Sequence, residues 1–177
     1  MRKAFAEALK RVADGKEPPG EDLTALIGAN EEERVSLFNL ADEVRSRFVG
    51  EDVHLRGIIE FSNYCVKNCL YCGLRKDNRD LVRYRMSPAE IIEGARRAVA
   101  LGCRTIVLQS GEDGVYTAGV LADIVHTIKR ELGVAVTLSI GDRPRKDYAV
   151  LREAGADRYL LKHETCDARL FAALRPG

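Results

Sequence analysis

The sequence has almost no excess of either charge. Its 28 Lys and Arg residues and 27 Asp and Glu residues leave a formal net charge of +1 at pH 7. A protein that binds nucleic acid mainly through attraction to phosphates carries a clear basic excess, so this class of partner is excluded. The apolar runs are far shorter than the roughly 20 residues that a transmembrane helix needs, which excludes a membrane partner of that kind.

A secretory signal and a paired cysteine framework are also lacking. The first five residues, Met1 to Phe5, carry charge within a helical pattern and contain no apolar signal core. A cytoplasmic location is therefore expected. The five cysteines are an odd number, which argues against a fully paired set of disulfides. In a reducing compartment, clustered thiols more often bind metal.

The composition that is present, 46% apolar and 31% charged residues in a chain of 177, is typical of one globular domain or a fragment of one. Residues 1–50 are expected to form a helical cap, with helices before and after a break at Lys16–Gly20. The pattern predicts helices over 21–27 and 31–48. The second of these carries an apolar stripe that includes Val35, Phe38 and Val44, and the side expected to face solvent is instead the one with Asp42, Glu43, Arg45 and Arg47.

Residues 51–177 alternate between strand and helix patterns. Strands are expected over 53–62, 105–109, 134–140 and 158–162, and helices over 88–101, 119–131 and 147–153. Gly102, Gly133 and Gly155 follow the three helices, where a left-handed residue commonly ends a helix. The alternation predicts βαβ units and a parallel sheet.

Four βα units fit either an open doubly wound sheet or part of a barrel. Polar residues recur with one parity along the strands, and this pattern favours a barrel whose inner face lines a wet cavity. Since a complete barrel needs at least about 200 residues, the expected fold is α/β: N-terminal helices followed by the first four βα units of a TIM-type barrel, truncated. Open strand edges in such a half barrel are expected to promote self-association and to prevent repeated turnover.

Directly after the first expected strand, Cys65, Cys69 and Cys72 form the pattern C-x₃-C-x₂-C. Three thiolates on a four-iron cluster leave one iron open to an outside ligand. The alternative is a structural zinc site completed by Cys103, Cys166 or His163. Apart from that alternative, Cys103 is interpreted as a small buried residue and His163 as a packed one, and Cys166 is given no role.

These residues resemble the signature of the radical S-adenosylmethionine (SAM) superfamily, which has an aromatic residue before the last cysteine, here Tyr71. The resemblance implies that the three cysteines hold a [4Fe–4S] cluster and that the amino and carboxylate groups of SAM chelate its fourth iron. It further implies an enzyme that cleaves SAM reductively to a 5′-deoxyadenosyl radical, with a protein such as ferredoxin or flavodoxin as the electron donor.

The resemblance extends to the ends of the later strands. Ser110-Gly111-Glu112 stands where the superfamily has a Gly-Gly-Glu-like motif that contacts the SAM amino group, with serine replacing the first glycine. Ser139 and Glu164 stand where relatives contact the methionyl or ribose part of SAM. Residues at consecutive strand ends share one edge of a barrel, where such enzymes keep their active sites.

Within the superfamily, the chain resembles most the HydE family of [FeFe]-hydrogenase maturases, and more loosely biotin synthase and methylornithine synthase. The resemblance runs from about residue 35 onward and is carried by 54–65, 71–75, 83–86, 107–113 and 154–165. It implies a small amino-acid-derived or organometallic substrate and hydrogenase maturation proteins as partners.

Thr137, Arg158 and Lys162 are expected to point inward by parity and to bind the substrate carboxylate. The family more often has arginine where Lys162 stands, and lysine lacks the bidentate fork. The alternative is that Arg158 and Lys162 pair with Glu60 or Glu164. A function of another class also stays open, a cluster- or zinc-binding scaffold without turnover.

Overall fold

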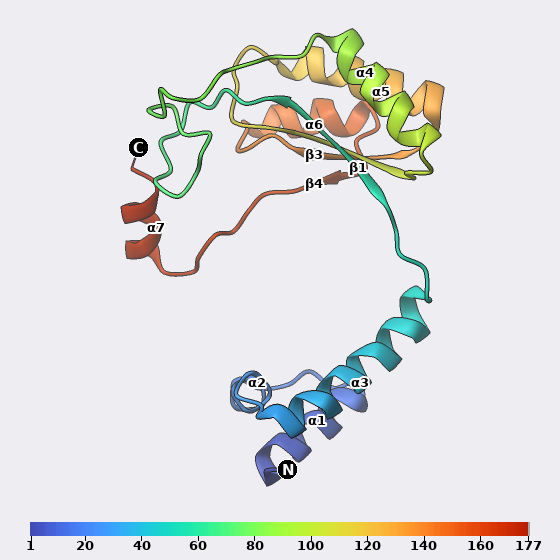
Figure 1. The fold of residues 1–177 in the computed structure, drawn as a ribbon, viewed down its shortest axis with the longest axis vertical. Helices are drawn as coiled ribbons and strands as arrows, with labels where there is room; N and C mark the ends of the chain where they lie inside the picture. The colour runs from blue at the N-terminus through green and yellow to red at the C-terminus, as the bar shows by residue number, and fades with distance from the viewer. Residues whose placement is uncertain (177) are drawn as a thin grey trace. The chain divides into compact units, whose positions relative to one another are not determined.

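The chain divides into two units, Met1–Val53 and His54–Gly177, close to the boundary expected after residue 50. The computed structural model describes residues 1–176, and Figure 1 shows the elements of each unit. Within the described residues, no helix is long and apolar enough to cross a membrane.

The first unit consists of helices α1 (Lys3–Ala13), α2 (Gly20–Ile27) and α3 (Glu31–Val49). Phe5, Ala8 and Leu26 form its small apolar core. Asn30 caps α3 in a capping box with Glu33, whose buried carboxylate also accepts hydrogen bonds from Arg2. These contacts hold the first turn of α3 against the other two helices.

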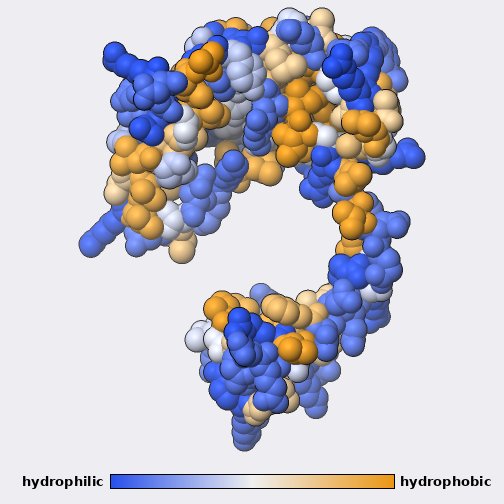
Figure 2. Space-filling view, viewed as in Figure 1, coloured by the Kyte–Doolittle hydropathy of each residue, from blue (hydrophilic) through white to orange (hydrophobic). Residues whose placement is uncertain are grey.

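The apolar stripe predicted along α3 is not buried, and that prediction was wrong. Val35, Phe38 and Val44 are exposed, and apolar side chains reach the surface among polar ones (Figure 2). The reason is that α3 is joined to α1 and α2 near its start, where Glu33 is buried and Leu37 packs on the small core.

The second unit is built on a parallel sheet in the order β1-β2-β3-β4, formed by Arg56–Ser62, Thr105–Ser110, Ala135–Ser139 and Arg158–Tyr159. Helices α4 (Pro88–Ala100), α5 (Ala118–Leu132) and α6 (Arg145–Glu153) alternate with the strands and gather on one side of the sheet (Figure 1). The predicted α/β fold of four successive βα units is therefore confirmed.

Burial of one strand face explains why the sheet and helices pack together. Ile59, Leu108 and Leu138 are neighbours in register on β1, β2 and β3 and belong to a core that also contains Ile124 and Ile128 of α5. Removing such side chains from water is the main favourable contribution to folding. The opposite strand face carries the polar residues Glu60, Gln109 and Ser139 in register at its carboxyl end, and Ile58 and Val107 lie further back on the same face.

Local signals begin and end the helices where the sequence indicates. Ser87 caps α4 in a capping box, with Pro88 in the first turn, and Thr117 caps α5. Gly102, Gly133 and Gly155 all have positive φ, which confirms the left-handed positions predicted after the three helices.

The fourth strand and the last helix differ from expectation. A strand was expected over 158–162, but β4 contains only Arg158–Tyr159, because β3 ends at Ser139 and Gly141, with a φ of 76°, turns the neighbouring chain away. The short helix α7 (Ala168–Leu174) was not predicted, although Asp167 caps it and helix formers follow.

Candidate functional site

A cavity of about 630 Å³ lies at the carboxyl ends of the strands in the second unit. Its walls come from the loop that follows β1, the ends of β2 and β3, residues 160–164 and α7. In parallel α/β folds this edge of the sheet is where ligands bind, because the loops of successive units meet there. The cavity is the candidate site.

A β-bulge at the end of β1 directs the chain into this cavity. The register with β2 shifts between Glu60 and Ser62, so that Glu60 pairs with Gln109 and Ser62 with Ser110. A bulge re-aims the residues that follow it. The irregular segment from Asn63 to Arg85, called here the cysteine loop, begins directly after it.

Cys65, Cys69 and Cys72 all line the cavity with partly buried side chains, and all three are free thiols. The sulfur of Cys65 accepts hydrogen bonds from the backbone amides of Lys67 and Glu112, each 3.4 Å away. The structure thus brings the three predicted ligands to one wall, and backbone amides face the first of them.

No three His, Cys, Asp or Glu side chains within residues 1–176 are arranged to hold a single metal ion. In a four-iron cluster each thiolate binds a different iron, so the thiols need not converge on one point. Cys103 precedes β2 and lines a separate small cavity with Val99 and Leu132. Since the strands are parallel, it lies at the opposite end of the sheet from the cysteine loop.

Two glycines allow the loops around the cavity to approach one another. A Cβ atom on Gly111 would lie 2.3 Å from the carbonyl oxygen of Tyr64, so only glycine fits between β2 and the cysteine loop. A Cβ atom on Gly141 would lie 2.0 Å from Cγ of Glu112. The side chain of Glu112 therefore packs directly on the turn that follows β3.

The carboxylate of Glu112 lies between two cations. Its oxygens are 3.7 Å from Nζ of Lys67 and 3.6 Å from a guanidinium nitrogen of Arg175, which follows α7. The same cavity wall contains Ser110 and Gly111. Glu112 is thus an ionic acceptor with cations on both sides, and it faces the space beside the thiols.

Tyr71 lines the cavity between the last two cysteines. Partial burial, with the neighbouring Cys69 and Glu164, raises the pKa of Tyr71 to about 12, so the side chain is a neutral phenol at pH 7. Glu164 itself has a φ of 66°, a left-handed conformation that is uncommon for a residue other than glycine. Such backbone strain often occurs at functional sites.

The remaining predicted residues lie at two depths. Ser139 and Lys162 line the cavity, as does His163. Thr137 and Arg158 are register partners one step further along the inner face and are not among the lining residues. Cys166 is exposed.

The alternative pairing of Arg158 and Lys162 with Glu60 or Glu164 is not seen among the ion pairs of the described residues. Neither Arg158 nor Lys162 forms an ion pair with Glu60 or Glu164 in residues 1–176. The carboxylate of Glu60 instead accepts a hydrogen bond of 3.0 Å from the amide of Gln109.

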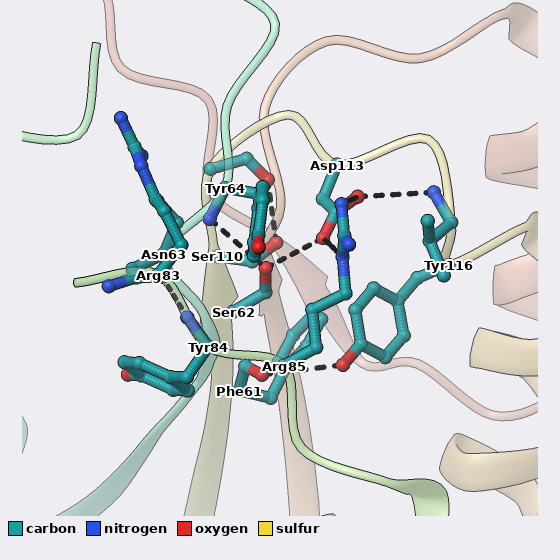
Figure 3. A network of polar contacts seen from close by, with 12 residues as sticks. Phe61, Ser62, Asn63, Tyr64, Arg83, Tyr84, Arg85, Ser110, Asp113 and Tyr116 are labelled. Carbon is teal, nitrogen blue, oxygen red and sulfur yellow. Dashed lines mark hydrogen bonds and ion pairs between the residues drawn. The ribbon is translucent and has the colours of Figure 1, made fainter. Parts of the chain in front are cut away.

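A network centred on the buried carboxylate of Asp113 lies next to the cavity and was not predicted from the sequence (Figure 3). The hydroxyl of Ser62 donates to Asp113 over 2.7 Å, and Arg85 donates to both carboxylate oxygens over 2.6 and 3.0 Å. The guanidinium of Arg85 also lies 3.6 Å from the ring centroid of Tyr64. No periodic pattern marks these residues, but all of them lie in the stretches 54–65, 83–86 and 107–113 that carry the family resemblance, which was the signal available in the sequence.

Burial alone would raise the pKa of Asp113, but the hydrogen bonds from Arg85 and Ser62 hold it below its ordinary value. The carboxylate is therefore ionised at neutral pH. Asp113 follows Glu112 in the chain. Through Ser62 it binds the end of β1, and through Arg85 it binds the end of the cysteine loop.

The profile of the Radical SAM superfamily matches residues 59–176 of this chain. A curated relative, the [FeFe] hydrogenase maturase subunit HydE of Thermotoga maritima, is 62% identical over 141 residues, which cover 80% of this chain and 40% of the relative. The 3-methylornithine synthase of Methanosarcina acetivorans is 33% identical over 171 residues, which cover 95% of this chain and 49% of that protein. The chain thus spans less than half the length of either relative.

Two solved structures have the same fold as this chain over nearly all of its length. The crystal structure of methylornithine synthase (PylB) matches 96% of this chain with a TM-score of 0.85 and 29% identity, and the match covers 51% of that protein. A structure of HydG, a maturase of the [FeFe]-hydrogenase, matches 99% of this chain and 40% of that protein with a TM-score of 0.88. At 22% identity, the second match shows the fold alone.

Proposed function

The chain belongs to the radical SAM superfamily, a family of enzymes, and we propose that it holds a [4Fe–4S] cluster on Cys65, Cys69 and Cys72 and binds SAM beside it. The observation that carries the proposal is the placement of all three thiols on one wall of a cavity at the carboxyl ends of the strands.

The donor set fits such a cluster. Thiolates are the usual ligands of iron–sulfur clusters, and the three cysteines are free and partly open to the cavity. The amide of Glu112, which faces Cys65, supplies a hydrogen-bond donor of the kind that tunes a cluster. When bound, the cluster supplies the electron that cleaves SAM to methionine and a 5′-deoxyadenosyl radical.

Residues at the strand ends form the SAM contacts in this proposal. Glu112 accepts the SAM ammonium, because its carboxylate faces the cavity and Gly111 and Gly141 allow close approach. Ser139 and Glu164 offer oxygens to the methionyl and ribose groups from the neighbouring wall. Tyr71 remains a phenol and covers the cluster side of the cavity.

The reaction proposed is that of the HydE type, maturation of [FeFe]-hydrogenase. The 62% identity to the maturase, against 33% to the methylornithine synthase, supports this choice. The substrate is a small amino-acid-derived or organometallic molecule, and Lys162, with Thr137 and Arg158 deeper on the inner face, forms its binding surface. The partners proposed are a ferredoxin or flavodoxin and other hydrogenase maturation proteins.

Anaerobic reconstitution tests the cluster. We expect about four iron and four sulfide per chain, and replacement of Cys65, Cys69 and Cys72 with alanine together abolishes uptake. The matched controls are Cys103→Ala and Cys166→Ala, which remove thiols outside the cavity and leave the iron content unchanged. Full iron content in the triple variant, or stoichiometric zinc in the purified wild type, contradicts the proposal.

Electron paramagnetic resonance of the reduced cluster tests SAM binding. SAM is expected to change the wild-type spectrum, and Glu112→Gln weakens this response because a neutral amide holds an ammonium less strongly than a carboxylate does. Glu60→Gln is the control, since Glu60 lies in the cavity wall but is bonded to Gln109. An unchanged wild-type spectrum with SAM present contradicts the proposed SAM site.

A further inference from the structure

The two ends of the cysteine loop pair with each other. Ser62 and Arg85 form an antiparallel bridge, and the amide of Met86 donates to the carbonyl of Phe61 over 2.8 Å. The side chain of Asn63, at the start of the loop, also bonds to its returning end: it donates to the carbonyl of Val82 and accepts from the amide of Tyr84. The first and last residues of the cysteine loop are therefore neighbours in space (Figure 3).

One side chain, Arg83, reaches from the returning end into the loop. Its Nη1 donates to the carbonyl of Asn63 and, over 2.9 Å, to the carbonyl of Leu74. Its Nη2 donates to the carbonyls of Arg75 and Asn78 over 2.7 and 3.2 Å. A single guanidinium thus joins the backbone just before Cys65 to the backbone just after Cys72.

The hydrogen-bond partners of the Arg83 side chain are carbonyl oxygens, its guanidinium lies 5.9 Å from the ring centroid of Tyr64, and within residues 1–176 it forms no ion pair with a carboxylate. Its contacts therefore define backbone positions rather than neutralise a charge. The planar guanidinium can serve several carbonyls at once, whereas the ammonium of lysine is a compact point charge without this fork. Arg83 is also absent from the cavity wall, so it does not contact a bound ligand directly.

We propose that Arg83 is the positioning residue of the cysteine loop: by holding carbonyls on both sides of the C-x₃-C-x₂-C segment, it sets the spacing of the three thiols. The inference rests on the proposed function for the identity of the group that the thiols hold. It assigns to Arg83 a role that neither the cysteine motif nor the cavity wall indicates.

Two substitutions separate the geometry of Arg83 from its charge. Arg83→Lys retains the charge and loses the fork, and Arg83→Gln loses both. Arg79 provides the matched controls Arg79→Lys and Arg79→Gln, because it is an exposed arginine of the same loop whose side chain forms no hydrogen bond or ion pair within the described residues.

The first measurement needs no cluster. Hydrogen exchange of the apo chain follows the amide of Lys76, which donates across the loop to the carbonyl of Lys67 over 2.9 Å. Both Arg83 variants are expected to increase its exchange about tenfold or more, as expected for a loop that opens more often. The Arg79 variants retain wild-type exchange. Equal exchange in all five proteins overturns the proposal.

The second measurement follows iron release to a chelator after anaerobic reconstitution. Both Arg83 variants are expected to lose iron about tenfold faster than wild type, a usual effect of removing a residue that orients metal ligands. The unfolding midpoint of each variant is measured in the same preparation, so that faster iron release can be compared with any loss of overall stability. Iron release at the wild-type rate in Arg83→Lys overturns the positioning role.

A third measurement distinguishes positioning from general support of the fold. Both Arg83 variants lose the fork that holds the carbonyls on both sides of the thiols. The midpoint potential of the cluster that each variant retains is therefore expected to differ from the wild-type value, while the Arg79 variants keep that value. A wild-type potential in Arg83→Lys overturns the positioning role. A loss of stability alone moves neither potential. If the wild type takes up no cluster, the proposed function fails, and the hydrogen-exchange result still decides the role of Arg83.

Discussion

The sheet of the second unit and the cysteine loop are held in different ways. In the sheet, Ile59, Leu108 and Leu138 are buried in one continuous apolar core with the helices. In the loop, every residue from 64 to 85 is at least partly exposed. Its conformation depends instead on hydrogen bonds from Arg83, Arg85 and Asn63.

This difference shows how one chain combines a rigid base with an open site. Apolar packing needs no particular angle between groups, but it requires burial, which would close the cavity. Hydrogen bonds to backbone carbonyls need specific geometry and tolerate exposure. The loop can therefore present three thiols to a cavity while the apolar core between the sheet and the helices remains closed to water.

The largest effect is expected from Leu108→Ala, which removes a fully buried side chain from the central region of the sheet. The free energy of unfolding should fall by about 2–5 kcal/mol, since the change loses transfer energy and leaves a cavity. Urea titration of the whole chain measures it. Leu101→Ala is the control, because Leu101 is 80% exposed, and a similar loss there would contradict the assigned core.

Gly111→Ala tests the contact where the sheet meets the loop. The new Cβ atom would lie 2.3 Å from the carbonyl oxygen of Tyr64 and 2.7 Å from Cβ of Cys65. We expect a loss of about 1–3 kcal/mol in unfolding free energy from overpacking, with reduced iron uptake on reconstitution. Gly114→Ala has no atom within 4 Å of its Cβ and should match wild type in both measurements.

Asp113→Asn removes the ion pair that ties the loop to β2. The cost should be about 1–3 kcal/mol at pH 7, because Arg85 keeps partial access to water after it loses its partner. The pKa of Asp113 is lower in the folded state than its ordinary value of 3.8, so its contribution is complete above that value and disappears as the pH falls through the folded pKa.

The difference in stability between wild type and Asp113→Asn should therefore shrink as the pH falls below about 4, toward the folded pKa. Urea titrations at a series of pH values measure this. Asp80→Asn is the control, since Asp80 is an exposed carboxylate of the same loop. A stability difference between wild type and Asp113→Asn that grows on acidification would contradict the assignment of Asp113 as an ionised partner of Arg85.

The smallest effect is expected from Ser87→Ala at the junction between the loop and α4. Ser87 accepts from the amide of Glu90 and closes a capping box. Loss of the cap should cost about 1 kcal/mol in unfolding free energy. Ser87→Thr keeps the hydroxyl and should retain most of the stability, so equal losses in the two variants would show that the cap contributes little.

The expectations that held depend on short-range patterns. Alternating apolar segments indicated the four βα units, and Gly102, Gly133 and Gly155 marked helix ends because positive φ favours glycine. The expectations that failed depend on distant partners. The strand over 158–162 is short because β3 ends beside it, and the stripe on α3 is exposed because its neighbours pack only near the start of that helix.

The sequence by itself determined the cysteine spacing, the order of strands and helices, and the residues available at each strand end. Only the tertiary structure decided that Glu112 lies between Lys67 and Arg175, that Cys103 is remote from the other thiols, and that Arg83 and Asp113 hold the loop. The physical reason is distance along the chain. Local propensities act over a few residues, whereas these contacts join segments that become neighbours only when the sheet has formed.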